Sequence, residues 1–254
     1  MIECYTCKRL IESQANFCGY CGSSQREHKV KKVNTHVGYI IAFYIAFLIL
    51  AIINNYAYGD EAIFETEVVM ESLFILLTLG FASLDFKAIL NLYTIKTINW
   101  VGMALAIVVP LCTVFIVYYG IEVLNVVLEL YSDNFYEGYA YYDNPMLWAV
   151  LFVAITPPVF EELAFRGFLF NQLEKVASVR VTILATAFIF ALIHFSFISF
   201  LWIFPFGIFL GYLRHKYKTL WLGMLVHFIH NLGVLLLEYY YYQGDAAPLF
   251  EIIQ

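Results

Sequence analysis

This sequence contains few charged side chains. Asp, Glu, Lys and Arg make up 13% of its 254 residues, whereas 62% are hydrophobic. Ordinary soluble domains carry about 25% charged residues, so the composition excludes that class. Because each crossing needs about 20 apolar residues, the chain has room for seven or eight transmembrane helices. A net charge of −6 gives no reason to expect nucleic acid as a partner.

Seven apolar runs predict the membrane spans. They lie at residues 36–55, 68–84, 98–119, 146–165, 181–197, 198–213 and 219–241. The fifth and sixth runs meet at residues 194–199, where polar residues favour a tight hairpin over one long helix. The stretch 121–144 is interpreted as an amphipathic helix on the outer interface. We therefore predict an all-α polytopic membrane protein with about seven transmembrane helices.

Lys and Arg are missing from every second connection between these runs. Thirteen of the 14 cations precede the first run or follow the second, fourth and sixth. The connections at 54–67, 122–143 and 195–199 contain none, and neither does the tail after residue 238. Since cytoplasmic loops are enriched in Lys and Arg, this alternation predicts a cytoplasmic N-terminus and an outer C-terminus. The opening residues MIECYTCKRL also lack the features of a signal peptide.

Four cysteines near the N-terminus have the spacing of a metal site. Cys4 and Cys7, then Cys18 and Cys21, form CxxC-x10-CxxC, which suits tetrahedral Zn²⁺. Two disulfides are the alternative, but a reducing cytoplasm favours zinc. Four protein ligands leave no open position, so the site is expected to be structural and to serve a possible cytoplasmic partner. We predict a zinc ribbon at 1–28, a basic linker at 29–35 and a membrane domain at 36–254.

The fourth apolar run contains ionisable residues, which are costly in a membrane unless paired or facing water. Glu162 and Arg166 are four residues apart in the order that favours a same-face ion pair, so we predict a supporting role for them. Glu161 points about 100° away and needs another partner. Pro157 and Pro158 remove two backbone donors, which predicts a kink or a broken helix just before the glutamates.

Polar side chains also occur in two later runs, and a depth argument brings them together. His194 is as far from the turn near residues 177–178 as Glu161, so the two should meet at one level. His227 and Asn231 share a helix face roughly 14 to 20 Å from the inner surface. His230 lies to the side of that face and is interpreted as a structural histidine. Glu71 is interpreted as marking the edge of the second span.

This set of residues has the chemistry of an amide hydrolase. A carboxylate beside an imidazole can act as general base and then general acid for water, which fits Glu161 and His194. An imidazole and a carboxamide can donate hydrogen bonds to the oxyanion of a tetrahedral intermediate, which fits His227 and Asn231. None of the three motifs has a Ser or Cys evidently paired with a base, so a covalent mechanism has less support.

Three motifs in order, EExxxR at 161–166, FxxxH at 190–194 and HxxxN at 227–231, resemble the CPBP family of intramembrane proteases, also called the CaaX protease or ABI family. The resemblance covers about residues 145–235. It implies a glutamate-type endopeptidase acting on a membrane-associated peptide or protein. It also implies a bacterial cell membrane as location, since a fused zinc ribbon is similar to bacterial members. The implied catalytic residues are Glu161, His194, His227 and Asn231, supported by Glu162 and Arg166.

Three other functions remain open from the sequence. Zn²⁺ bound by Glu161, His194 and His227 would make a metal-dependent protease, although HExxH is absent and no catalytic cofactor is expected. A catalytically silent scaffold or bacteriocin-immunity protein of the same family would use the motifs to bind a peptide. A proton-linked transporter would use the same side chains as a relay, but no internal repeat is evident. We expect cleavage near the cytoplasmic half of the bilayer.

Overall fold

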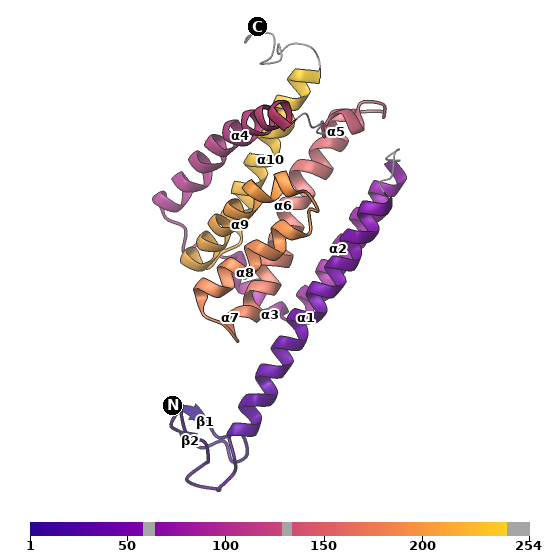
Figure 1. Cartoon of the computed structure of the whole chain (residues 1–254). Coiled ribbons are helices and arrows are strands. Elements are labelled where there is room, and N and C mark those ends of the chain that lie inside the picture. The colour runs from indigo at the N-terminus through magenta and orange to yellow at the C-terminus, as the bar shows by residue number, and fades with distance from the viewer. Residues whose placement is uncertain (58–63, 129–133, 243–254) are drawn as a thin grey trace.

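The chain is an all-α polytopic membrane protein with a small cysteine-rich ribbon at its N-terminus (Figure 1). The computed structural model describes residues 1–57, 64–128 and 134–242. Its elements are β1 (Ile2–Glu3), β2 (Leu10–Ile11), α1 (Arg26–Ala57), α2 (Phe64–Ser83), α3 (Phe86–Leu90), η1 (Asn91–Tyr93), α4 (Trp100–Leu128), η2 (Glu137–Tyr139), α5 (Pro145–Ala149), η3 (Val150–Ile155), α6 (Thr156–Glu161), η4 (Glu162–Leu169), α7 (Phe170–Glu174), α8 (Val179–Leu192), α9 (Phe197–Tyr217) and α10 (Trp221–Tyr242).

Six helices within the described residues are long and apolar enough to cross a membrane, and a seventh is too short. The six are α1, α2, α4, the continuous run α5–α7 (Pro145–Glu174), α9 and α10. The fifth predicted span, 181–197, is corrected: α8 has 14 residues. At 1.5 Å per residue it covers about 21 Å, less than a hydrocarbon core of about 30 Å. The hairpin from α8 to α9 therefore turns inside the depth of the bundle.

The expected interfacial helix at 121–144 is also corrected. Residues 121–128 extend α4, and the described part after the gap contains only the short turn η2. The tyrosine-rich end of this stretch packs instead on the start of α2. Tyr139 hydrogen bonds to Glu67 through its hydroxyl, and Tyr142 accepts a hydrogen bond from the Phe64 backbone at 2.8 Å. Segment 134–142 thus covers one end of α2.

The two ends of the bundle differ. Figure 1 shows α3 and α7 on the side nearer the ribbon, and α5 and the end of α10 on the opposite side. The ribbon side carries ion pairs of Lys175 with Asp85 at 3.1 Å and of Lys218 with Glu174 at 3.4 Å. We call these the ribbon end and the far end. The cation-rich connections after the second, fourth and sixth predicted runs belong to the ribbon end.

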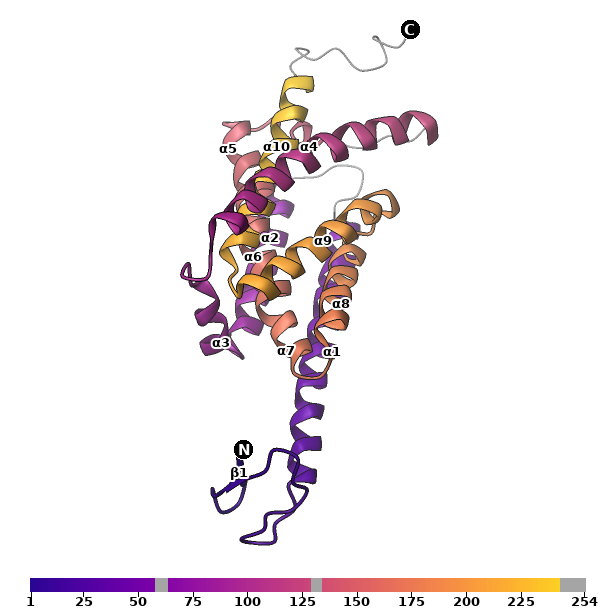
Figure 2. The ribbon, with the colours of Figure 1, turned by 90° about the vertical axis from the view of Figure 1, so that its left-hand side faces the viewer.

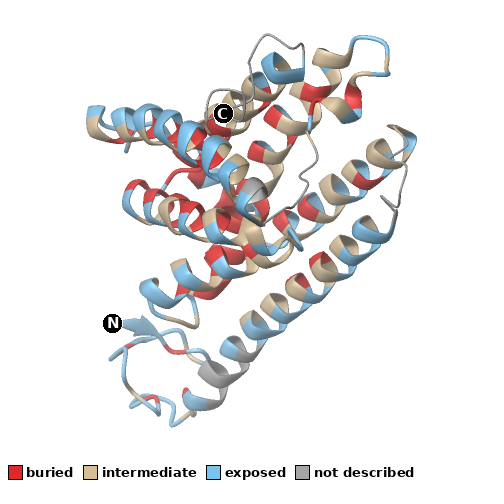
Figure 3. Ribbon diagram, turned by 45° about the horizontal axis from the view of Figure 1, so that its top comes forward, coloured by how far each residue is buried: buried red, intermediate tan, exposed pale blue. Residues whose placement is uncertain are grey.

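The segment η4 lies at the centre of the packing. All eight of its residues are buried, and Phe165 and Phe168 have no exposed surface. Phe43 of α1 packs against both rings, with centroid distances of 5.5 and 5.8 Å. Figure 3 shows the buried residues gathered along the inner faces of the bundle, while α1 is exposed over much of its length. Figure 2 shows α8 and α9 packed side by side next to this core.

Candidate active site and metal centre

The predicted irregularity before the glutamates takes the form of widened helical turns. In the described chain, π-helical turns occupy η3 and η4, on either side of the short α6. Pro157 and Pro158 have no backbone N–H, so the Val153 carbonyl four and five residues earlier has no helical donor. Asn231 of α10 donates its side-chain amide to that carbonyl at 2.9 Å. The helix therefore continues through the prolines because a neighbouring helix supplies the missing donor.

Glu162 and Arg166 form the predicted ion pair in full burial. The Arg166 Nη1 and Glu162 Oε1 atoms are 2.8 Å apart, and both residues are 0% exposed. Arg166 also donates to the Gly207 carbonyl at 3.3 Å and lies 4.3 Å above the Phe190 ring. One guanidinium thus joins η4, α8 and α9. A buried charge of this kind is tolerated only when its partners are held in place.

His227 lies between the two glutamates. Its Nε2 atom is 3.7 Å from Glu161 Oε2, and its Nδ1 atom is 3.6 Å from Glu162 Oε1. The histidine is 5% exposed, and the Phe190 and Phe206 rings pack around it at 6.0 and 5.8 Å. His227 therefore lies between Glu161 and the ion pair, in contact with both carboxylates.

His194 is positioned by the end of α8. Its Nδ1 atom donates to the Phe190 carbonyl at 2.7 Å, since a carbonyl oxygen can only accept. That bond leaves Nε2 of the neutral ring as an acceptor, which is the form a general base requires. The side chain is exposed, not enclosed like His227.

Glu161 and His194 line one cavity of about 320 Å³. The cavity starts at these two residues and follows α1 to Asn54 and Asn55, toward the far end of the bundle. The cavity therefore extends away from the ribbon end. The lining residues are Phe47, Leu50, Ala51, Asn54, Asn55, Glu67, Met70, Glu71, Phe74, Pro157, Glu161, Ile193, His194 and Phe195.

His230 is not among the residues that line this cavity. It is 1% exposed, and its Nδ1 atom is 2.9 Å from the Thr113 hydroxyl of α4. The rings of Trp202 and Phe206 stack near it at 5.0 and 4.9 Å. The histidine therefore ties α10 to α4 and α9.

Several residues of the site were not found from the sequence. Glu67 and Glu71 of α2 line the cavity, although Glu71 was interpreted as a span boundary. Its position as an ionisable residue in an apolar run was the available signal. Gly223 of α10 was missed entirely: a Cβ atom there would lie 2.5 Å from Glu162 Oε2. The close approach of α10 to Glu162 requires a residue without a side chain.

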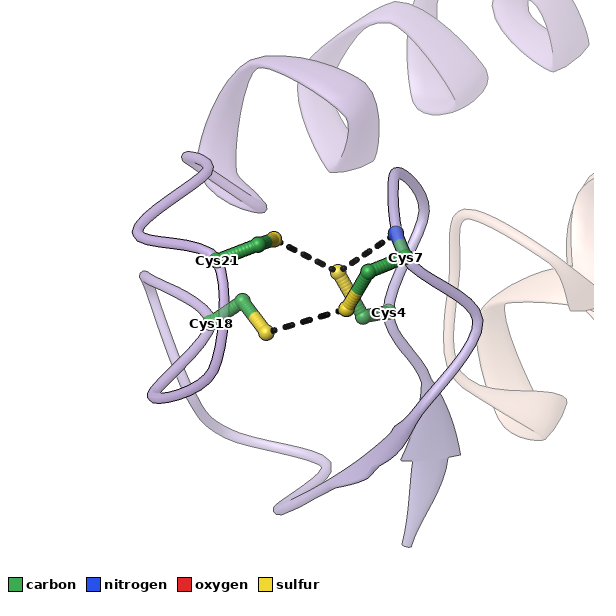
Figure 4. Close-up of side chains that lie close together, drawn as sticks. All are labelled: Cys4, Cys7, Cys18 and Cys21. Atoms are coloured by element: carbon green, nitrogen blue, oxygen red, sulfur yellow. Dashed lines mark hydrogen bonds between the residues drawn. The ribbon is translucent and has the colours of Figure 1, made fainter.

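The four N-terminal cysteines form a site that suits a tetrahedral metal ion (Figure 4). Their sulfur atoms all lie within 4.8 Å of one another, with Cys4 to Cys21 at 3.7 Å and Cys7 to Cys18 at 3.6 Å. Tetrahedral coordination at about 2.3 Å requires sulfur separations of about 3.8 Å, whereas a disulfide requires about 2.05 Å. The spacing therefore fits a shared metal ion and excludes the disulfide alternative for this arrangement.

The two cysteine loops have the same backbone design. Lys8 donates to the Cys4 carbonyl and Gly22 to the Cys18 carbonyl, each at 2.9 Å. Lys8 and Gly22 also share a positive φ, 61° and 72°. Glycine adopts this conformation without strain, which explains the second loop, whereas Lys8 is held in it.

Hydrogen bonds prepare the cysteines unequally for a metal. The Cys7 backbone N–H and the Ser23 hydroxyl lower the pKa of Cys4 to about 5. The Ser23 hydroxyl also lowers the pKa of Cys21. Although the Arg9 backbone lowers it, desolvation and the other three sulfurs raise the pKa of Cys7 to about 11. The Cys7 thiol therefore stays protonated unless a cation enters the cluster.

A second metal site is not assembled from the membrane motifs. Within the described residues, the four cysteines are the group whose ligand atoms gather closely enough for one ion. Glu161, His194 and His227 do not meet that spacing, although Glu161 is 3.7 Å from His227 and lines the same cavity as His194. Glu161 and His194 instead line the cavity, and His227 contacts Glu161 from behind that lining.

Comparison with known proteins agrees with the motifs. Residues 143–233 match the model of a family described as "Type II CAAX prenyl endopeptidase Rce1-like". The matched region runs from just before α5 into α10 and contains all three motifs, but neither α1 nor α2. No curated protein matches the sequence.

The contact between Gly223 and Glu162 gives a test of the buried ion pair. Gly223→Ala should lower the thermal unfolding temperature of the purified protein, because the new methyl group displaces a carboxylate that Arg166 and His227 hold. Overpacking of this kind costs about 1–3 kcal/mol. Gly80→Ala is the matched control, since nothing lies within 4 Å of a Cβ atom at that position. Equal unfolding temperatures for Gly223→Ala and wild type would contradict the tight fit.

The ribbon gives a second test. Cys4→Ser should remove most bound metal, measured by elemental analysis of the purified protein, because three thiolates coordinate a tetrahedral ion far more weakly. The unfolding temperature of the membrane bundle should stay unchanged. Cys112→Ser is the control, because Cys112 is exposed on α4 and outside the cluster. Retention of full metal content by Cys4→Ser would show that the cysteines do not bind as one site.

Proposed function

Starting from the Rce1-like CAAX prenyl endopeptidase domain at residues 143–233, we propose that this protein is an intramembrane endopeptidase of glutamate type. It hydrolyses a peptide bond in a membrane-associated peptide or protein. The observation that carries the proposal is the shared cavity of Glu161 and His194, in which a carboxylate and an imidazole acceptor face the same space.

The reaction needs one water molecule between these two side chains. Glu161 and Nε2 of His194 each accept one hydrogen of the water, which directs an oxygen lone pair at the substrate carbonyl. As the water oxygen bonds to the carbonyl carbon, its proton passes to Glu161. When the C–N bond of the tetrahedral intermediate breaks, Glu161 returns that proton to the leaving nitrogen. Atoms and charge balance without a covalent enzyme intermediate.

The other motif residues support this step. His227 lies 3.7 Å from the Glu161 carboxylate and 3.6 Å from Glu162, the partner of Arg166. In the proposed mechanism, His227 and Asn231 donate to the oxyanion of the intermediate. Asn231 uses one amide N–H for the Val153 carbonyl and has a second one for this purpose.

The proposal also includes a zinc ion in the cysteine ribbon and the orientation of the protein in the membrane. The ribbon holds zinc, with Cys4, Cys7, Cys18 and Cys21 as ligands, and the charged ribbon end of the bundle faces the cytoplasm. The ribbon then presents its surface to a cytoplasmic partner. A zinc ion at the glutamate and histidines is the rival chemistry, and it would require these side chains to draw closer than they stand.

Substitution of the base tests the function directly. Glu161→Gln should reduce the rate of cleavage of lipid-anchored peptides by about 10²- to 10⁴-fold, the usual contribution of a general base, while thermal unfolding stays the same. His194→Ala should act in the same direction. The measurement is mass spectrometry of products from full-length protein in lipid nanodiscs. Glu65→Gln, an exposed residue of α2, controls for loss of charge.

Three results would contradict parts of this proposal. Full activity of Glu161→Gln would refute the glutamate mechanism. A chelator that stops cleavage by a variant lacking residues 1–28 would favour catalytic zinc. Tight peptide binding with no cleavage by wild type would favour the catalytically silent scaffold, the second candidate function, because the same cavity would then serve recognition alone.

A further inference from the structure

The cavity beside Glu161 and His194 has an unusual charge. Three of its lining residues are acids, Glu67, Glu71 and Glu161, and no Lys or Arg belongs to the lining within the described chain. Ionised carboxyl groups that share a small space repel one another, so a positively charged group that enters the cavity relieves this repulsion. Two of the three acids come from α2, which lies outside the matched family region.

Among the three acids that line the cavity, Glu71 is the one with a buried oxygen that lacks a hydrogen-bond partner in the described part of the chain. Its Oε1 atom is buried and has no hydrogen-bond partner among the described residues. Glu67, one turn away, receives a hydrogen bond from the Tyr139 hydroxyl. Met70 and Phe74, which flank Glu71 on the same cavity wall, are apolar. Leaving a buried polar atom without a partner is unfavourable, so a hydrogen-bond donor that enters the cavity gains by pairing with Glu71.

A substrate peptide that occupied the cavity would lie next to these acids. Glu161 and His194 stand at the start of the cavity, and Glu67, Asn54 and Asn55 mark its far-end side. A peptide whose scissile bond lies at Glu161 and His194 would place its neighbouring residues between α1 and α2. Asn54 and Asn55 offer amide groups to such a backbone, while the carboxyl groups face its side chains.

We propose that Glu71 is a specificity-determining residue, which selects a substrate with a Lys or Arg side chain close to the scissile bond. This inference rests on the proposed function and extends it to the class of substrate. A cationic side chain can pair with the carboxylates of the cavity. An acidic side chain would have to take up protons or meet like charge in a partly dehydrated space. Selection therefore arises from repulsion as well as attraction.

Matched peptides test the selection. Lipid-anchored peptides carry Lys, Gln or Glu in turn at each of the three positions on either side of one fixed bond. The dissociation constant is measured by fluorescence anisotropy with full-length protein in nanodiscs, and kcat/KM by product formation. At one or more positions, wild type should bind the Lys peptide at least tenfold more tightly than the Glu peptide, with the Gln peptide between them.

Variants of α2 identify the selecting group. Glu71→Gln should reduce the Lys-to-Glu preference to less than threefold, and Glu71→Lys should reverse it, with KM changing more than kcat. Glu65→Gln removes the same charge from the same helix outside the cavity, so it should keep the wild-type preference. Reversal by the Lys variant distinguishes selection from damage to the fold, because a damaged protein loses affinity for all three peptides.

Each result decides between two statements. Equal binding of all peptides by wild type, or an unchanged preference in both Glu71 variants, overturns the role of Glu71 even if cleavage occurs. Absence of binding to any peptide overturns it as well. A charge preference that depends on Glu71 without any cleavage supports the inference and refutes the endopeptidase function.

Discussion

The buried ion pair of Glu162 and Arg166 is the interaction on which the rest of the site depends. Two charges with 0% exposure are stable only if suitable partners surround them. The Gly207 carbonyl and the Phe190 ring contact the guanidinium, and Gly223 makes room for the carboxylate, although Arg166 Nε and Glu162 Oε2 have no hydrogen-bond partner among the described residues. The pair thereby fixes α8, α9 and α10 around η4.

Pro157 and Pro158 shape the helix that carries this ion pair, because they have no backbone N–H groups. Without two N–H groups, the backbone before Glu161 cannot keep regular α-helical bonds, and the Val153 carbonyl turns to Asn231 instead. In a membrane such a carbonyl must find a donor within the protein. The amide of Asn231 therefore has a structural task, and any catalytic role must use its second N–H. This hydrogen bond links the motif helix to α10.

Local pattern predicted the parts of this protein that depend on neighbours in sequence. The i, i+4 spacing gave the Glu162–Arg166 pair, and the CxxC loops gave the cysteine cluster, because both contacts form within short segments. Contacts between distant helices could not be predicted in this way. Glu71 and Glu161 meet only because α2 packs beside α6, and α8 ends at Leu192 because a turn, not hydrophobicity, limits it. The polar residues at 194–199 predicted the turn between α8 and α9, but not that α8 would end as early as Leu192.

Helix α1 connects the cysteine ribbon with the cavity. It runs without interruption from Arg26, next to the cysteine ribbon, to Ala57, and its residues Phe47, Leu50 and Ala51 form a wall of the cavity. His36 of α1 is 2.8 Å from the Gln172 side chain, which in turn donates to Asp85 at 3.1 Å. These bonds anchor the helix at the ribbon end, and Phe43 and Phe47 pack it into the core farther along. One continuous helix therefore links the ribbon to the cavity wall, and His36 bonds to Gln172 of α7 between them.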